Sequence, residues 1–153
     1  MKTQKQWFDE YAISHQNKTN QLIHYICVPL IFFSIVGLFM SIPSKGIENL
    51  IKMNNPILEN WATVILFILL FFYIKLSFST FLKMLLFSLT CLVGNYYLSN
   101  LIHLFYASLV IFVVAWIGQF YGHKLEGKKP SFFKDLQFLL IGPAWVFEKI
   151  SKK

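Results

Sequence analysis

The sequence contains no arginine, only two cysteines and few charged residues, and these shortages exclude several classes of protein. Charged residues make up 14% of the chain, whereas a soluble globular domain has about 25%. Cys27 and Cys91 both lie in apolar runs, so a disulfide scaffold is excluded. No CxxC, P-loop or GxGxxG motif occurs.

What the chain has in excess is apolar and aromatic residues. Hydrophobic residues make up 56% of its 153 residues, and 17 are Phe, which excludes intrinsic disorder. This length fits a single domain, spanning residues 1–153. The net charge of +7 comes from lysine, and beside long apolar runs it favours an anionic membrane surface over nucleic acid as the partner. The first 20 residues are polar, so we expect no cleavable signal peptide.

Several runs are long and apolar enough to span a bilayer, which requires about 20 apolar residues. We expect spans at about residues 22–42, 61–78, 80–98 and 101–121. The second and third runs almost meet, with Lys75 and Lys83 on either side of the junction. Two lysines at the bilayer centre would be costly, so we interpret this region as two helices joined by a tight turn at the membrane surface.

The lysines are distributed unevenly over the loops that this topology predicts. Twelve of the fourteen lie on the side of the two termini, and only Lys45 and Lys52 lie on the other. The bias predicts cytoplasmic termini. The runs lack amphipathic periodicity, which argues against a soluble helical bundle. We therefore predict an all-α, multi-pass integral membrane protein of a bacterial inner membrane or an endoplasmic reticulum.

Two further segments have the composition of helices at the membrane interface. Residues 3–15 predict a short amphipathic helix. Residues 131–150 mix apolar residues with Gly142-Pro143, and we expect this pair to break any helix there. Residues 41–60 predict a polar loop.

Histidines His15 and His24 are placed to meet at the cytoplasmic surface. Along one continuous helix, nine residues would put them on opposite faces. The polar segment between them predicts a turn, however, and Asn17, Thr19 or Asn20 can cap a new helix. A helix–turn–helix can therefore bring both rings together. Asn20 lies four residues before His24, on the same helical face.

A second polar group lies at the end of the last predicted span. Gln119, His123 and Glu126 are spaced i, i+4 and i+7, so they share a helical face. This end is also cytoplasmic in the predicted topology. His103 lies about 30 Å away along the same helix, near the other membrane face, and we expect a structural role for it.

Three histidines and one carboxylate on one membrane face suit non-haem iron, and zinc is also possible. A mononuclear iron site with open positions can accept both O2 and a chelating substrate. The histidine boxes of the di-iron membrane desaturases, HxxxH and HxxHH, do not occur.

Two segments carry a family resemblance. Residues 11–29, with the pattern H-x4-N-x3-H-x4-P, and residues 119–130, with Q-x3-H followed by Glu126 and Pro130, resemble a family of small membrane proteins, as does the later Gly142-Pro143. That family includes the 2-hydroxy fatty acid dioxygenase of the yeast endoplasmic reticulum, an iron(II) enzyme of fatty-acid α-oxidation.

The resemblance implies that His15, His24 and His123 hold Fe(II), with Asn20, Gln119 and Glu126 as ligands or as partners of the ligands. It implies a fatty-acid substrate and O2 as the reactants. Two alternatives stay open at this point. One is a non-enzymatic protein that binds lipid or a partner and holds a structural metal. The other is a zinc-dependent membrane hydrolase with Glu126 as its base.

Overall fold

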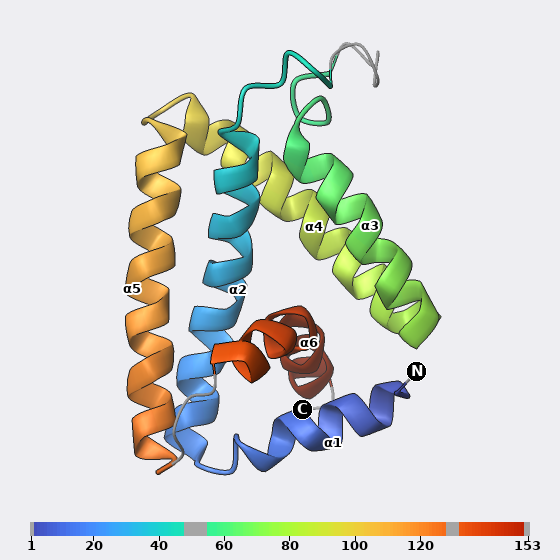
Figure 1. Cartoon of the computed structure of the whole chain (residues 1–153), viewed down its shortest axis with the longest axis vertical. Coiled ribbons are helices and arrows are strands. Elements are labelled where there is room, and N and C mark those ends of the chain that lie inside the picture. Colours follow the sequence, from blue (N-terminus) through green and yellow to red (C-terminus); the bar gives the residue numbers. More distant parts are fainter. Residues whose placement is uncertain (1, 48–54, 128–131, 152–153) are drawn as a thin grey trace. The chain divides into compact units, whose positions relative to one another are not determined.

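The computed structural model describes residues 2–47, 55–127 and 132–151, and these contain six helices (Figure 1). The helices are α1 (Gln4–Ile13), α2 (Lys18–Met40), α3 (Trp61–Leu76), α4 (Phe78–Ser99), α5 (Leu104–Leu125) and α6 (Phe132–Ser151). The predicted all-helical fold is confirmed. The chain divides into two compact units, Met1–Phe32 with Val113–Lys153 and Phe33–Phe112, and both α2 and α5 contribute to each unit.

Polar side chains determine where several helices begin. Thr3 and Gln6 form a capping box at the start of α1. The Asn17 side chain accepts hydrogen bonds from the backbone N–H groups of Thr19 and Asn20, at 2.8 and 3.2 Å, and so caps α2. The expected turn between His15 and His24 therefore exists, and Asn17 is the N-cap of the helix that follows it.

Three helices, α2, α4 and α5, are long and apolar enough to cross a membrane. Their bounds differ from the expected spans by a few residues. Helix α3 is apolar but has 16 residues. At 1.5 Å per residue it is about 24 Å long, which is shorter than the ~30 Å hydrocarbon core.

Helices α3 and α4 pack against each other and are joined at Ser77. Ser77 is extended and ends α3, while its side chain accepts a hydrogen bond from the N–H of Thr80 at 3.1 Å and so caps α4. The predicted two helices, instead of one long helix, are confirmed, with Lys75 and Lys83 on either side of this junction.

The same unit holds a buried polar group, the Asn95 contact, formed by Asn95 and Ser108 around Gly37. The Asn95 side chain is fully buried and donates hydrogen bonds to the carbonyls of Phe33 and Cys91, at 3.0 and 2.9 Å. A Cβ on Gly37 would lie only 2.1 Å from Ser108 Oγ and 2.3 Å from Asn95 Oδ1. Glycine is therefore required where α2 passes these two side chains.

The expected break at Gly142-Pro143 is wrong, because α6 runs through both residues. A proline inside a helix removes one hydrogen bond and costs about 3 kcal/mol. Burial offsets this cost, since Ile141 to Val146 are all buried. A Cβ on Gly142 would lie 3.1 Å from the Tyr11 hydroxyl and 3.2 Å from Val28 Cγ1, so the glycine lets α6 approach α1 and α2 closely.

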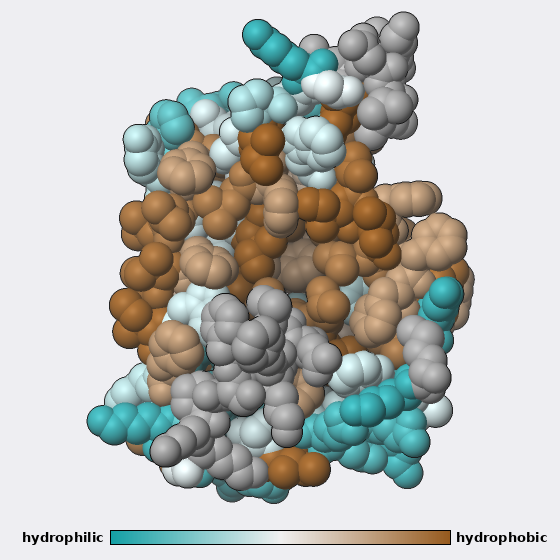
Figure 2. Space-filling model, viewed as in Figure 1, coloured by the Kyte–Doolittle hydropathy of each residue, from teal (hydrophilic) through white to brown (hydrophobic). Residues whose placement is uncertain are grey.

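The surface of α5 is apolar along its length. Exposed large hydrophobic residues follow its outer side, among them Val110, Val114 and Ile117. Figure 2 shows brown side chains over α5, whereas teal side chains gather over α1. Such a continuous apolar surface on a helix of this length is typical of contact with lipid.

Candidate metal centre

His15 lies just beyond the end of α1, where the chain turns towards α2. Its backbone N–H donates to the Ala12 carbonyl at 3.1 Å. Its ring Nδ1 lies 2.6 Å from the Tyr11 carbonyl, and the ring stacks on the Tyr11 ring with centroids 4.0 Å apart. A carbonyl only accepts, so Nδ1 carries the proton and Nε2 carries the lone pair that a metal needs.

His24 lies in the second turn of α2 and is held in the same way. Its Nδ1 lies 2.9 Å from the Asn20 carbonyl, four residues earlier in the helix. This bond also places the proton on Nδ1 and leaves the Nε2 lone pair as the possible ligand. Backbone carbonyls thus orient two imidazoles, as is usual for histidines that bind metals.

His123 comes from the last two turns of α5, and two glycines allow that helix to approach α2. A Cβ on Gly118 would lie 2.7 Å from Cys27 Sγ, and a Cβ on Gly122 would lie 2.4 Å from Asn20 Oδ1. No side chain larger than hydrogen fits at either position without movement. The glycine pair therefore determines how closely His123 approaches His24.

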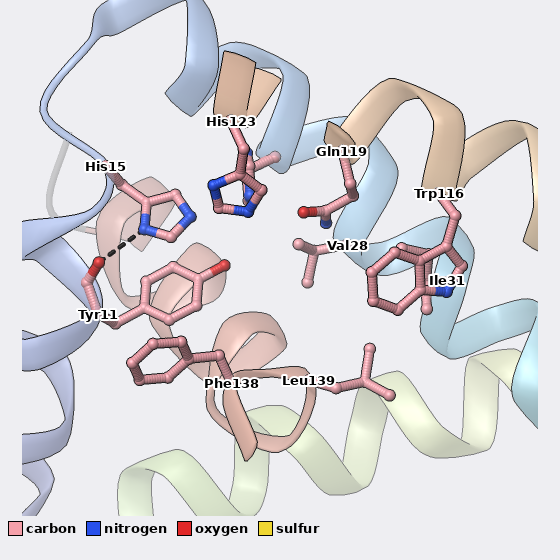
Figure 3. A pocket seen from close by; sticks show the side chains of 10 residues that line it. Tyr11, His15, Val28, Ile31, Trp116, Gln119, His123, Phe138 and Leu139 are labelled. Carbon is pink, nitrogen blue, oxygen red and sulfur yellow. Dashed lines mark hydrogen bonds between the residues drawn. The ribbon is translucent and has the colours of Figure 1, made fainter. Parts of the chain in front are cut away.

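The three imidazoles form one buried group, which we call the histidine centre (Figure 3). One nitrogen of each ring lies within 4.8 Å of one nitrogen of the other two. The ring centroids are 4.2 Å apart for His15 and His24, 5.0 Å for His24 and His123, and 5.4 Å for His15 and His123. All three histidines are buried, and none exposes more than 7% of its surface.

This group can hold a metal ion. Three nitrogens bound to one ion at about 2.1 Å are about 3.4 Å apart in a tetrahedral site, so an ion would draw the ligand atoms together by up to about 1.4 Å. The donor set is three neutral nitrogens, which suits iron, zinc and copper better than magnesium or calcium.

Glu126 lies outside the group of possible ligand atoms and contacts the turn between α1 and α2. Its carboxylate accepts hydrogen bonds from the backbone N–H groups of Gln16 and Asn17, at 2.8 and 2.9 Å. It also accepts one from the Asn20 side chain at 2.9 Å. The carboxylate thereby ties the end of α5 to the turn that carries His15.

Burial would raise the pKa of the Glu126 carboxyl, but the hydrogen bonds from Asn17, Asn20 and Gln16 outweigh it and hold the pKa below its ordinary value. The carboxylate is therefore charged at neutral pH. Asn20 is fully buried, and it links this carboxylate to the Ser14 carbonyl, 3.3 Å from its Nδ2. Glu126 and Asn20 are thus placed to fix the backbone around the histidine centre.

A cavity of about 20 Å³ adjoins the histidine centre. A water molecule needs about 10–15 Å³ by this measure, so the cavity holds little more than an ion or one water. Figure 3 shows the Gln119 amide pointing into this space, between His123 and Trp116. The lining residues are Tyr11, His15, His24, Val28, Ile31, Trp116, Gln119, His123, Phe138 and Leu139.

His103 precedes α5, at the end of that helix opposite to His123, and it is exposed. Its carbonyl accepts the N–H of Ala107 at 3.2 Å, and its ring lies 4.8 Å from that of Tyr106. It is not in the histidine centre, as the sequence predicted.

Sequence reasoning missed the aromatic wall of the site. Tyr11 and Trp145 expose 3% and 2% of their surface, and their rings lie 5.0 Å apart. Trp145 also lies 5.7 Å from His15. Tyr11 could have been found from its i, i+4 spacing to His15. Trp145 lies beyond the expected break in α6, and no sequence pattern linked it to the site.

Comparison with known proteins gives one match. A family model described as 2-hydroxy-palmitic acid dioxygenase Mpo1-like matches residues 1–153. No curated protein and no solved structure matches the chain.

Proposed function

Since the chain belongs to the Mpo1-like family of 2-hydroxy-palmitic acid dioxygenases, we propose that it is a membrane-embedded iron(II) dioxygenase that shortens 2-hydroxy fatty acids by one carbon. The histidine centre is the observation that carries this proposal. The atoms of the reaction balance when one 2-hydroxy acid and one O2 give the shorter fatty acid, CO2 and water.

His15, His24 and His123 are the proposed ligands of the iron. A structural zinc site usually has four protein ligands, whereas three leave positions open for small molecules. When bound, Fe(II) would supply the electrons for O2 activation and a template for a substrate that chelates through its carboxylate and 2-hydroxyl. The Nδ1 bonds to the Tyr11 and Asn20 carbonyls keep the Nε2 atoms of His15 and His24 directed at this position.

The chain's remaining residues would bind and orient the substrate and exclude water. Val28, Ile31, Trp116 and Leu139 line the apolar part of the cavity and would contact the first carbons of the acyl chain. The cavity is smaller than this substrate, so binding requires side chains to move. Phe138 and Leu139 of α6 are half-buried, and we expect the side chains of these two lining residues to move when substrate binds.

We also propose that α2, α3, α4 and α5 all cross the bilayer and that both termini are cytoplasmic. The lysine distribution supports this orientation. Helix α3 can span if the bilayer thins locally, which costs only fractions of a kcal/mol per ångström of mismatch. The histidine centre then lies at the cytoplasmic surface of a bacterial inner membrane or an endoplasmic reticulum, where a fatty acid can enter from the lipid.

A zinc hydrolase with Glu126 as its base is less well supported. Both oxygens of that carboxylate accept hydrogen bonds from the turn, and neither belongs to the group of possible ligand atoms. A general base needs contact with the attacking water, directly or through one other water.

The proposal is tested by anaerobic purification, metal analysis and an assay of O2 uptake and product with 2-hydroxypalmitate. We expect about one iron per chain and release of the fatty acid one carbon shorter. The His24→Ala and His123→Ala variants should lose the iron and the activity, while His103→Ala should keep the iron and the activity. Full activity after rigorous removal of iron, or without O2, would reject the proposal.

A further inference from the structure

Gln119 is a polar residue that lines the cavity and does not belong to the group of three histidines. It lies on α5 one turn before His123, and Trp116 lies almost one turn before it. Figure 3 shows these three side chains in order along the cavity, opposite to residues of α2. Helix α2 lines the cavity with His24 and Ile31, and α5 lines it with His123 and Trp116. Each helix thus contributes one histidine and one apolar side chain.

Gln119 is buried, since the residue exposes only 7% of its surface. No residue whose side chain the structure describes forms a hydrogen bond with its amide. A primary amide has two donor hydrogens and an acceptor oxygen, and at Gln119 these atoms face the cavity. A ligand in the cavity would supply their hydrogen-bond partners.

The cavity's chemistry indicates which ligand this is. Figure 3 shows His15 and His123 on one side of Gln119 and the apolar side chains of Ile31, Trp116 and Leu139 on the other. This arrangement matches a molecule with a polar head and an apolar tail. Gln119 lies where the head joins the tail. In a 2-hydroxy fatty acid, this junction carries the hydroxyl group on the second carbon.

We propose that Gln119 recognises the 2-hydroxyl, and that its amide oxygen accepts a hydrogen bond from this group. The inference rests on the proposed function, because that function places the carboxylate and hydroxyl beside the histidine centre. The site would then prefer a 2-hydroxy acid to the plain fatty acid of the same length, since the plain acid leaves the buried amide unpaired.

Binding to the zinc-loaded protein tests this without turnover. Wild type, Gln119→Leu and Gln119→Glu, each in lipid nanodiscs, are titrated with 2-hydroxypalmitate and with palmitate. Ser108→Ala is the matched control, because it removes a fully buried polar group from the same helix outside the cavity.

We expect wild type to bind 2-hydroxypalmitate at least about tenfold more tightly than palmitate. Gln119→Leu should lose most of that preference through weaker binding of 2-hydroxypalmitate, while its zinc content stays that of wild type. Gln119→Glu should retain part of the preference, since its side chain still accepts a hydrogen bond. Ser108→Ala should behave as wild type.

Three results would overturn the inference, and they are distinguishable. If Gln119→Leu keeps the wild-type preference for 2-hydroxypalmitate over palmitate, Gln119 does not recognise the hydroxyl. Loss of zinc from Gln119→Leu would mean that the amide is a metal ligand. If wild type binds neither acid and turns over neither in the iron form, the proposed function itself fails.

Discussion

The histidine centre and the Asn95 contact are both buried polar groups within an apolar chain, yet their polar atoms are used differently. Asn95 donates both of its hydrogen bonds to backbone carbonyls, of Phe33 and of Cys91. In the histidine centre, carbonyls bind Nδ1 of His15 and of His24, and one nitrogen of each of the three rings lies near one common point. The first arrangement connects backbone segments, whereas the second also creates a place for a ligand.

Burial of a polar residue in an apolar helix therefore does not by itself identify a functional site. Both regions also depend on glycine, with Gly37 beside Asn95 and Gly122 beside Asn20. The histidine centre differs from the Asn95 contact because nitrogens of three side chains converge beside a cavity.

Removal of one imidazole should abolish metal binding, whereas removal of Asn95 should not. We expect His24→Ala to lower the iron content to background and activity by at least about a hundredfold, because two ligands hold the ion poorly. Asn95→Ala should keep its iron and lose about 1–3 kcal/mol of stability. Metal analysis and thermal unfolding of the two variants give the comparison, and iron retained by His24→Ala would contradict it.

Substitutions at Gly37 and Gly122 should distinguish the two regions in the same way. Gly37→Ala places a methyl group on Ser108 and Asn95 and should cost about 1–3 kcal/mol while leaving the iron content per folded chain unchanged. Gly122→Ala should displace Asn20 and lower both stability and iron content. Gly46→Ala is the control, since a Cβ there meets no atom within 4 Å. Equal iron content in all three variants would show that Gly122 does not influence the histidine centre.

The helices and the meeting of the histidines could be predicted from sequence because local signals determine them. Asn17 marks the turn, and the spacing of His123 and Glu126 places both at one end of α5. The continuity of α6 could not be predicted, because it depends on burial of Trp145 and on a close approach of Gly142 to Tyr11. The partners of Glu126 are more than 100 residues away in sequence, and only the folded turn brings them together.

Glu126 should act on the metal through the turn and not as a ligand. Glu126→Ala removes three hydrogen bonds to Gln16, Asn17 and Asn20 and should weaken iron binding about 10- to 100-fold, as loss of a residue that orients ligands does. The bound iron should keep the spectrum of wild type, because its ligands are unchanged. A changed ligand-field spectrum in the variant would instead assign the carboxylate to the metal.

The smallest expected effect is a pH dependence. Because its pKa is lower in the folded chain, Glu126 stabilises the fold above its unfolded pKa of about 4.3, and this stabilisation is lost as the pH falls through the folded value. The difference in unfolding temperature between wild type and Glu126→Gln should therefore be constant near pH 7 and shrink below about pH 4.3. A difference that grows on acidification would contradict the assigned hydrogen bonds.

X-ray absorption of the iron-loaded protein tests the histidine centre most directly. We predict a shell of nitrogen or oxygen ligands at about 2.1 Å with the multiple scattering of three imidazoles, falling to two in His123→Ala reloaded with excess iron. The spectrum of His103→Ala should equal that of wild type. A sulfur shell, or the same imidazole count in wild type and His123→Ala, would contradict coordination of the iron by the histidine centre.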